Sequence, residues 1–266
     1  MIDWTDVNGV SLRYELAGTG ERTLILLHEM GGTLETWDAV VDRFPDFRVL
    51  RFDMRGAGLS QKIRTLSFDE LIEDLRSLLD ALGIDDPVSI AGVAVGAAVA
   101  VGFAARYPSR VENLTLMSPA TGIPQERQEA TIAIAESIRG GGLRGRVEAR
   151  LDATYPARFR TDPGRFRAFR GRAIGNDPVS YAAYYQMLLQ LDLTTDLEAL
   201  CCRALVLAGS EDGTRPPERV ACDAGMIKGA VFETLLSGHV MPVLTPDLVA
   251  DRIRAFLRCA RRLPSS

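Results

Sequence analysis

Two hydrophobic patterns alternate along the chain and predict its fold. Short, almost wholly apolar runs are typical of parallel strands covered on both faces, and they occupy residues 23–27, 47–52, 87–91, 111–117 and 204–209. Between them lie segments with helical spacing; residues 67–82 place leucines and a phenylalanine along one face. Residues 10–17 alternate like a half-exposed strand near a sheet edge. This alternation predicts an α/β fold, with helices on both faces of a mostly parallel central sheet.

The rhythm changes between residues 119 and 196, where no continuous apolar strand appears. Helical stretches there are separated by glycine or proline turns at residues 140–142, 162–164 and 176–178. The α/β pattern then resumes and closes with a strand at residues 231–236 and a helix at residues 246–258. We therefore expect a core domain of residues 1–118 and 197–266, into which residues 119–196 are inserted as a helical cap.

The stretch from residue 87 to residue 105 predicts a strand, a sharp turn and a buried helix. An apolar run leads into Gly92-Val93-Ala94-Val95-Gly96, and an alanine-rich run of helical length follows. Glycines on both flanks allow backbone to approach backbone closely. The spacing is that of the nucleophile elbow, Gly-x-Ser-x-Gly, which exposes a serine at the end of a strand. Ala94 stands at the serine's position and has no hydroxyl.

Two further loops follow predicted strands and carry the partners that such a serine needs. Asp212 lies in the loop after residues 204–209, and His239 lies after the last strand. A histidine takes the proton of a hydroxyl nucleophile, and a carboxylate orients that histidine. The order nucleophile position, acid, histidine is that of hydrolase triads on α/β sheets. Glu211 is the alternative acid, but the placement after the strand favours Asp212.

The loop that begins at His28 fits an oxyanion site, where backbone N–H groups face a developing negative charge. By position the donors are the N–H groups of Met30 and Val95. Glu29 is unusual there, and we expect its carboxylate to point away or to be neutralised. His28 fits a structural hydrogen-bonding role better than that of a second base. The alternative is that the glycines of this loop only form a turn.

Several side chains are candidates for contact with a substrate. They are His28 and Glu29 in the oxyanion loop and Tyr181, Tyr185 and Met187 in the cap, whose helical spacing suits packing equally well. The cap is also rich in arginine, which binds carboxylates in a bidentate manner, so an anionic substrate is one option. The alternative is that these arginines are ordinary solvated surface cations, because the chain has only two lysines and uses arginine in their place.

Nearly the whole chain resembles the α/β-hydrolase superfamily and is most similar to its 3-oxoadipate enol-lactonase-like group. The resemblance lies in residues 33–38, 47–56 and 208–212, with Pro217-Glu218. It implies the α/β-hydrolase fold and cofactor-free hydrolysis of an ester, lactone or activated C–C bond through an acyl-enzyme. Ala94 would then occupy the serine's position, His239 would be the base and Asp212 its orienting acid. The chain departs from the family pattern at Glu29, Ala57 and Ala97.

Ala94 has two explanations at this stage. Either a serine has been replaced by alanine through engineering, which leaves the protein inactive, or the natural chain has lost its nucleophile. The retained Asp212 and His239 favour the first explanation. Two other functions stay open. One is a non-hydrolytic enzyme with a His-Asp base, either a lyase or a cofactor-free oxygenase. The other is an inactive relative that binds a small ligand.

Composition narrows the partners. The 266 residues carry a formal net charge of −4, which argues against nucleic acid, since that partner requires concentrated positive charge. No segment approaches the ~20 apolar residues of a membrane span, so we expect a cytoplasmic protein. The four cysteines lack the spacing of a metal site. We expect a small-molecule substrate with no metal and no cofactor, and a homodimer stays open.

Overall fold

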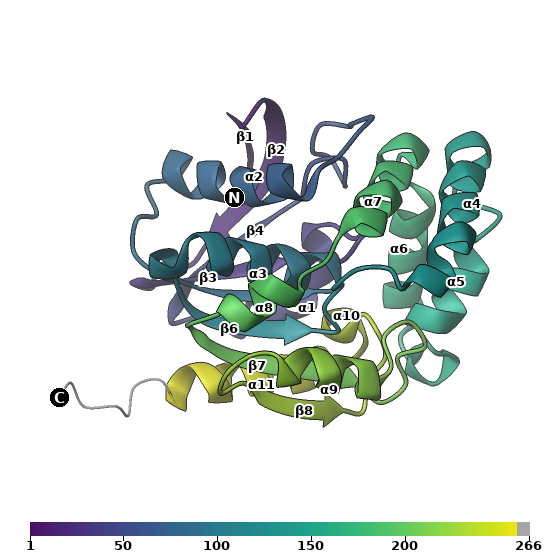
Figure 1. Ribbon diagram of the computed structural model, residues 1–266. Helices are drawn as coiled ribbons and strands as arrows, with labels where there is room; N and C mark the ends of the chain where they lie inside the picture. The colour runs from purple at the N-terminus through teal and green to yellow at the C-terminus, as the bar shows by residue number, and fades with distance from the viewer. Residues whose placement is uncertain (260–266) are drawn as a thin grey trace.

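One eight-stranded sheet organises the computed structural model, which describes residues 1–259 (Figure 1). The strand order is β1-β2-β4-β3-β5-β6-β7-β8. β2 runs antiparallel to both of its neighbours, β1 and β4. From β4 onward in this order, including β3, each strand pairs in parallel with the next. The strands are Ile2–Val7 (β1), Val10–Ala17 (β2), Arg22–Leu27 (β3), Phe47–Phe52 (β4), Val88–Val93 (β5), Val111–Met117 (β6), Arg203–Gly209 (β7) and Val231–Leu235 (β8).

The prediction of a mostly parallel α/β sheet is therefore confirmed. The sequence pattern did not indicate β1, because most of its side chains are exposed and it gains its place by pairing with β2. The helices of the core are Asp38–Val41 (α1), Phe68–Ala81 (α2), Val95–Arg106 (α3), Thr194–Ala199 (α8), Pro217–Gly225 (α9), Met241–Leu244 (α10) and Pro246–Cys259 (α11). None of the helices within residues 1–259 is both long and apolar enough to cross a bilayer.

The central strands bury both faces, as their continuous apolar runs require. Along β3, Ile25 and Leu27 pack into the larger core cluster with side chains of α2, α3, α8 and α9. Leu24 and Leu26 face the opposite way and pack with Trp37 and with side chains of α1, α10 and α11. Helices thus cover the sheet on both sides, and only the ends of the strands are left to carry a site.

The segment between β6 and β7 forms a group of helices beyond the carboxyl ends of the parallel strands (Figure 1). It contains Gln125–Gly141 (α4), Val147–Thr154 (α5), Pro163–Ile174 (α6) and Pro178–Gln190 (α7). We call residues 119–196 the cap. Helix α8 crosses the predicted boundary at residue 196, and its Leu197 lies in the core cluster that also contains α3.

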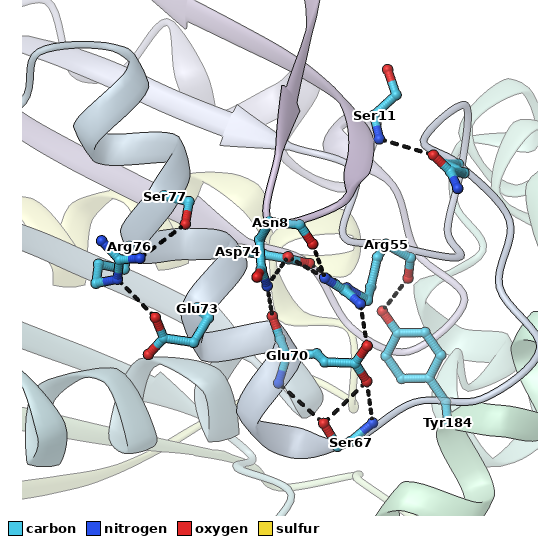
Figure 2. Close-up of polar contacts among 11 residues, drawn as sticks. Asn8, Ser11, Arg55, Ser67, Glu70, Glu73, Asp74, Arg76, Ser77 and Tyr184 are labelled. Atoms are coloured by element: carbon cyan, nitrogen blue, oxygen red, sulfur yellow. Dashed lines mark hydrogen bonds and ion pairs between the residues drawn. The ribbon is translucent and has the colours of Figure 1, made fainter.

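A buried ion-pair network fastens the loop after β4 to α2 and to the cap (Figure 2). The guanidinium of Arg55 donates to both carboxylate oxygens of Asp74, at 2.5 and 2.6 Å, and also to Glu70. Asn8 donates to Asp74 at 2.9 Å, and the Tyr184 hydroxyl of α7 donates to the Arg55 carbonyl at 2.9 Å. The network ties the loop to the turn between β1 and β2, to α2 and to α7.

Substitution Asp74→Asn should destabilise the fold by about 3–5 kcal/mol, because it leaves the buried Arg55 guanidinium without its main counter-charge. Urea unfolding followed by circular dichroism measures the change. Asp80→Asn on the same helix is the matched control: Asp80 pairs with Arg76 at a partly exposed surface, where an ion pair contributes about 0–1 kcal/mol. Equal losses in the two variants would contradict the assigned role of the network.

Candidate active site

Ala94 sits in a strained turn between β5 and α3. Its backbone angles are φ 50° and ψ −109°, a region that a residue with a Cβ adopts at a cost of about 1–3 kcal/mol. The flanking glycines make the turn sterically feasible. A Cβ on Gly92 would lie 2.5 Å from the Gly96 backbone, and a Cβ on Gly96 would lie 2.4 Å from the Leu27 carbonyl oxygen. The predicted strand, turn and helix are therefore present, with Ala94 at the apex.

The end of β6 holds this turn in place through its backbone. The Ala94 N–H donates to the Met117 carbonyl at 2.9 Å, and the Ala120 N–H donates to the Ala94 carbonyl at 3.0 Å. Ser118, between them, also has a positive φ of 45°, and its N–H donates to the Leu207 carbonyl of β7. The backbone at the end of β6 thus holds Ala94 in its strained conformation, and β7 supports that segment in turn.

Asp212 and His239 form the predicted acid–histidine pair. The His239 Nδ1 atom lies 2.8 Å from Asp212 Oδ2, and both side chains are buried. Asp212 Oδ1 accepts the backbone N–H groups of Thr214 and Arg215 at 2.8 and 2.9 Å. Burial alone would raise the pKa of the Asp212 carboxyl, but His239 and the Arg215 N–H outweigh it and hold that pKa below its ordinary value.

The acid loop and the histidine loop are joined to each other by backbone contacts. The Glu211 N–H donates to the Ser237 carbonyl at 2.9 Å, and the Ser210 N–H donates to the Leu235 carbonyl at 2.8 Å. Glycine is required where the loops touch, because a Cβ on Gly209 would lie 2.5 Å from the Gly238 carbonyl oxygen. The pair is therefore set by the ends of β7 and β8 and not by the two side chains alone.

The two predicted oxyanion donors lie in different elements. Val95 is the first residue of α3, where backbone N–H groups have no partner within the helix. Met30 lies in the loop of residues 28–33, which we call the oxyanion loop. Among the hydrogen bonds of the described residues, neither the Val95 N–H nor the Met30 N–H donates to a protein acceptor. Both are therefore available to another acceptor.

His28 serves the loop structurally. Its Nε2 atom accepts the Met54 N–H at 3.0 Å, so Nδ1 carries the ring proton and donates to the Glu29 carbonyl at 2.7 Å. The ring is 1% exposed. With both nitrogens used, His28 offers none to a substrate, which fits the structural role expected for it.

Glu29 is a buried carboxylate with an incomplete hydrogen-bond shell. Its Oε2 atom accepts the Thr36 hydroxyl at 3.0 Å, whereas Oε1 has no partner among the described residues. The carboxylate lies over Gly32, where a Cβ would come within 2.5 Å of it. No arginine or lysine within the described chain forms an ion pair with Glu29, so the expected neutralisation by direct pairing is not seen.

The three cap residues expected to contact substrate lie in different surroundings. Tyr181 packs above the oxyanion loop, with its ring close to Gly31, and its hydroxyl is buried without a partner in the described chain. Burial raises the pKa of the Tyr181 phenol. Tyr185 is half-buried and packs edge-on against Tyr181. Met187 lies within the main core cluster.

Residues that the sequence did not single out complete the surroundings. Arg150 and Asn176 of the cap donate to the Met30 and Gly31 carbonyls. Arg215 supports Asp212 through its N–H, and its side chain donates to Thr121 and to a neighbouring carbonyl. Asp followed by residues that donate back to it is an Asx-type turn, and that local pattern was the available signal for Arg215.

A family model matches most of the chain, and the chain belongs to that family. The family model described as the alpha/beta hydrolase fold matches residues 22–243, so this protein is a member of the α/β-hydrolase fold family. The predicted α/β-hydrolase fold is thereby confirmed.

Individual relatives span several reactions. A proline iminopeptidase of Pestalotiopsis fici is 25% identical over 97% of this chain and 99% of its own. The 3-oxoadipate enol-lactonase 2 of Acinetobacter baylyi is 24% identical, with 96% of each chain covered. The solved structure of a thermophilic esterase from Thermogutta terrifontis superposes with a TM-score of 0.90 at 29% identity, covering 97% of this chain and 98% of that one. The expected resemblance to enol-lactonases is confirmed, and the relatives include both esterases and lactonases.

The lowered pKa of Asp212 predicts a pH-dependent contribution to stability. A group whose pKa is lower in the folded state stabilises the fold fully above its unfolded pKa of about 3.9, and the contribution is lost as pH falls through the folded pKa. Asp212→Asn should therefore be less stable than the parent at pH 7, and the gap should shrink near pH 3. Urea unfolding at both pH values tests this, with the exposed Asp86→Asn as control. A gap that widens on acidification would contradict the assignment.

Proposed function

We propose that this chain has the architecture of a serine-type hydrolase for a small ester or lactone, with the nucleophile replaced by Ala94. His239 would be the general base and Asp212 its orienting acid. The N–H groups of Met30 and Val95 would bind the oxyanion. The chain with alanine would then lack acyl-enzyme chemistry while keeping the rest of the site.

Two observations together carry the proposal. The His239–Asp212 pair is formed, and residue 94 has a Cβ although its backbone has a strained, positive φ. Glycine would adopt the positive φ without steric cost, yet the chain keeps a residue with a Cβ there. A serine in this conformation would differ from Ala94 by one oxygen atom on that Cβ. This supports the interpretation that Ala94 stands where a serine belongs.

The chemistry expected of the completed site follows from the residues present. A serine hydroxyl at position 94 would attack the acyl carbon while His239 takes its proton, and the bond to the leaving alcohol would break as His239 returns that proton. The Asp212 carboxylate would hold Nδ1–H, leaving Nε2 free for the transfer. Water would then release the acid by the same steps.

Substitution Ala94→Ser should raise kcat/KM for p-nitrophenyl acetate by about 10³-fold or more over the protein with alanine, because triads contribute at least this much to acyl transfer. The assay follows nitrophenolate release, and a small lactone is measured in parallel by acid release. The double variant Ala94→Ser/His239→Gln is the matched control and should fall back toward the alanine protein.

Two results would overturn the proposal. One is an Ala94→Ser protein that folds normally and hydrolyses neither ester nor lactone. The other is full activity of the double variant, which would place the base elsewhere.

A second candidate is a His-Asp base enzyme that uses no nucleophile. The Glu29 carboxylate favours it, because a buried negative charge over Gly32 of the oxyanion loop would oppose a second negative charge on an oxyanion bound by that loop. Turnover of a ketone or cyanohydrin-type substrate by the alanine protein, lost in His239→Gln, would support this candidate over hydrolysis.

A further inference from the structure

The cap makes two hydrogen bonds to consecutive carbonyls of the oxyanion loop. The Arg150 Nη2 atom of α5 donates to the Met30 carbonyl at 2.6 Å. The Asn176 side-chain amide, in the turn before α7, donates to the Gly31 carbonyl at 2.9 Å. Residues 120 and 145 positions away along the chain thus fix two adjacent peptide groups.

Arg150 differs from several other cap arginines in what it binds. Arg160 and Arg170 form ion pairs with carboxylates at the surface. Within the described residues Arg150 forms no such pair, and its guanidinium lies 5.4 Å from the centre of the Tyr181 ring. A charged donor to a carbonyl gives a strong, directional bond. Its polar function is therefore directed at the oxyanion loop.

The two sides of Met30 are held by different parts of the molecule. The peptide group that carries the Met30 N–H is fixed from the core, because the Glu29 carbonyl accepts both the His28 ring N–H and the Gly32 N–H. The following peptide group is fixed from the cap by Arg150. Gly31 has a φ of 75°, so the loop turns sharply just after Met30. Without the cap, only one of the two peptide planes around Met30 would be restrained.

We propose that Arg150, assisted by Asn176, is a positioning residue. By fixing the peptide group that follows Met30, it limits rotation of the Met30 backbone and so helps the core contacts to keep the Met30 N–H in its oxyanion-binding direction. The cap would thereby complete the oxyanion site as well as cover it. The guanidinium also brings positive charge to a loop that carries the buried Glu29 carboxylate. This inference rests on the proposed hydrolytic function, since it assigns the Met30 N–H to a developing oxyanion.

The kinetic test compares a substitution of Arg150 on α5 with one just before that helix, both in the Ala94→Ser protein. Arg150→Met should lower kcat for p-nitrophenyl acetate about 10- to 100-fold, somewhat less than the loss of a whole oxyanion donor, with KM changed less than about threefold. Affinity for phenylboronic acid, which mimics the tetrahedral adduct, should fall by a similar factor. Arg150→Lys should recover part of kcat.

The matched control is Arg146→Met. Arg146 is an exposed arginine directly before the first residue of α5. It should leave kcat and boronate affinity unchanged. If Arg150→Met behaves like Arg146→Met, or if it raises KM alone, the positioning role is wrong.

A second measurement needs no activity and separates this inference from the proposed function. In the protein with Ala94, the ¹⁵N order parameter of the Met30 amide should drop in Arg150→Met from a rigid value near 0.85 toward about 0.6. It should stay unchanged in Arg146→Met. An unchanged value in both variants would overturn the positioning role even if Ala94→Ser proves active. A drop beside an inactive Ala94→Ser protein would overturn only the hydrolytic function.

Discussion

The close approach of backbone to backbone at the Ala94 turn is the constraint on which the site depends. β5 must end and α3 must begin within a single residue, and that is feasible only because Gly92 and Gly96 carry no side chain. The turn places the apex residue and the first N–H of α3 together at the carboxyl end of the sheet. Backbone bonds from the end of β6 fix that arrangement. The geometry of the turn is therefore set by the backbone and does not depend on the chemistry of the side chain at its apex.

The remaining parts of the site are held at the same end of the sheet by separate sets of hydrogen bonds and ion pairs. The acid and histidine loops are bonded to each other, the oxyanion loop is anchored by the His28 ring, and the loop after β4 is held by the buried Arg55 network. Each set joins segments that are distant in the sequence. This is why open α/β sheets collect function at the carboxyl ends of their strands, where loops from several strands meet.

Sequence patterns predicted most of the strands, the turn at Ala94 and the pairing of Asp212 with His239. These features can be recognised in the sequence from apolar runs, from the spacing of glycines and from the order of the residues along the chain. Arg150 and Asn176 were not identified as contacts of the oxyanion loop, because a hydrogen bond between residues more than 100 positions apart leaves no local pattern. The open carboxylate of Glu29 was unpredictable for the same reason: the direction of a side chain depends on neighbours such as Thr36 that only the fold brings near. The sequence did not predict β1, because this strand is defined by its pairing with β2 and not by a hydrophobic pattern.

The strained φ at Ala94 has a consequence for how chemistry can come and go on this scaffold. Because backbone hydrogen bonds from the end of β6 hold the conformation, the fold bears the conformational cost whether the side chain ends in a methyl group or a hydroxyl. An exchange between alanine and serine at position 94 therefore changes one oxygen atom with little structural penalty in either direction.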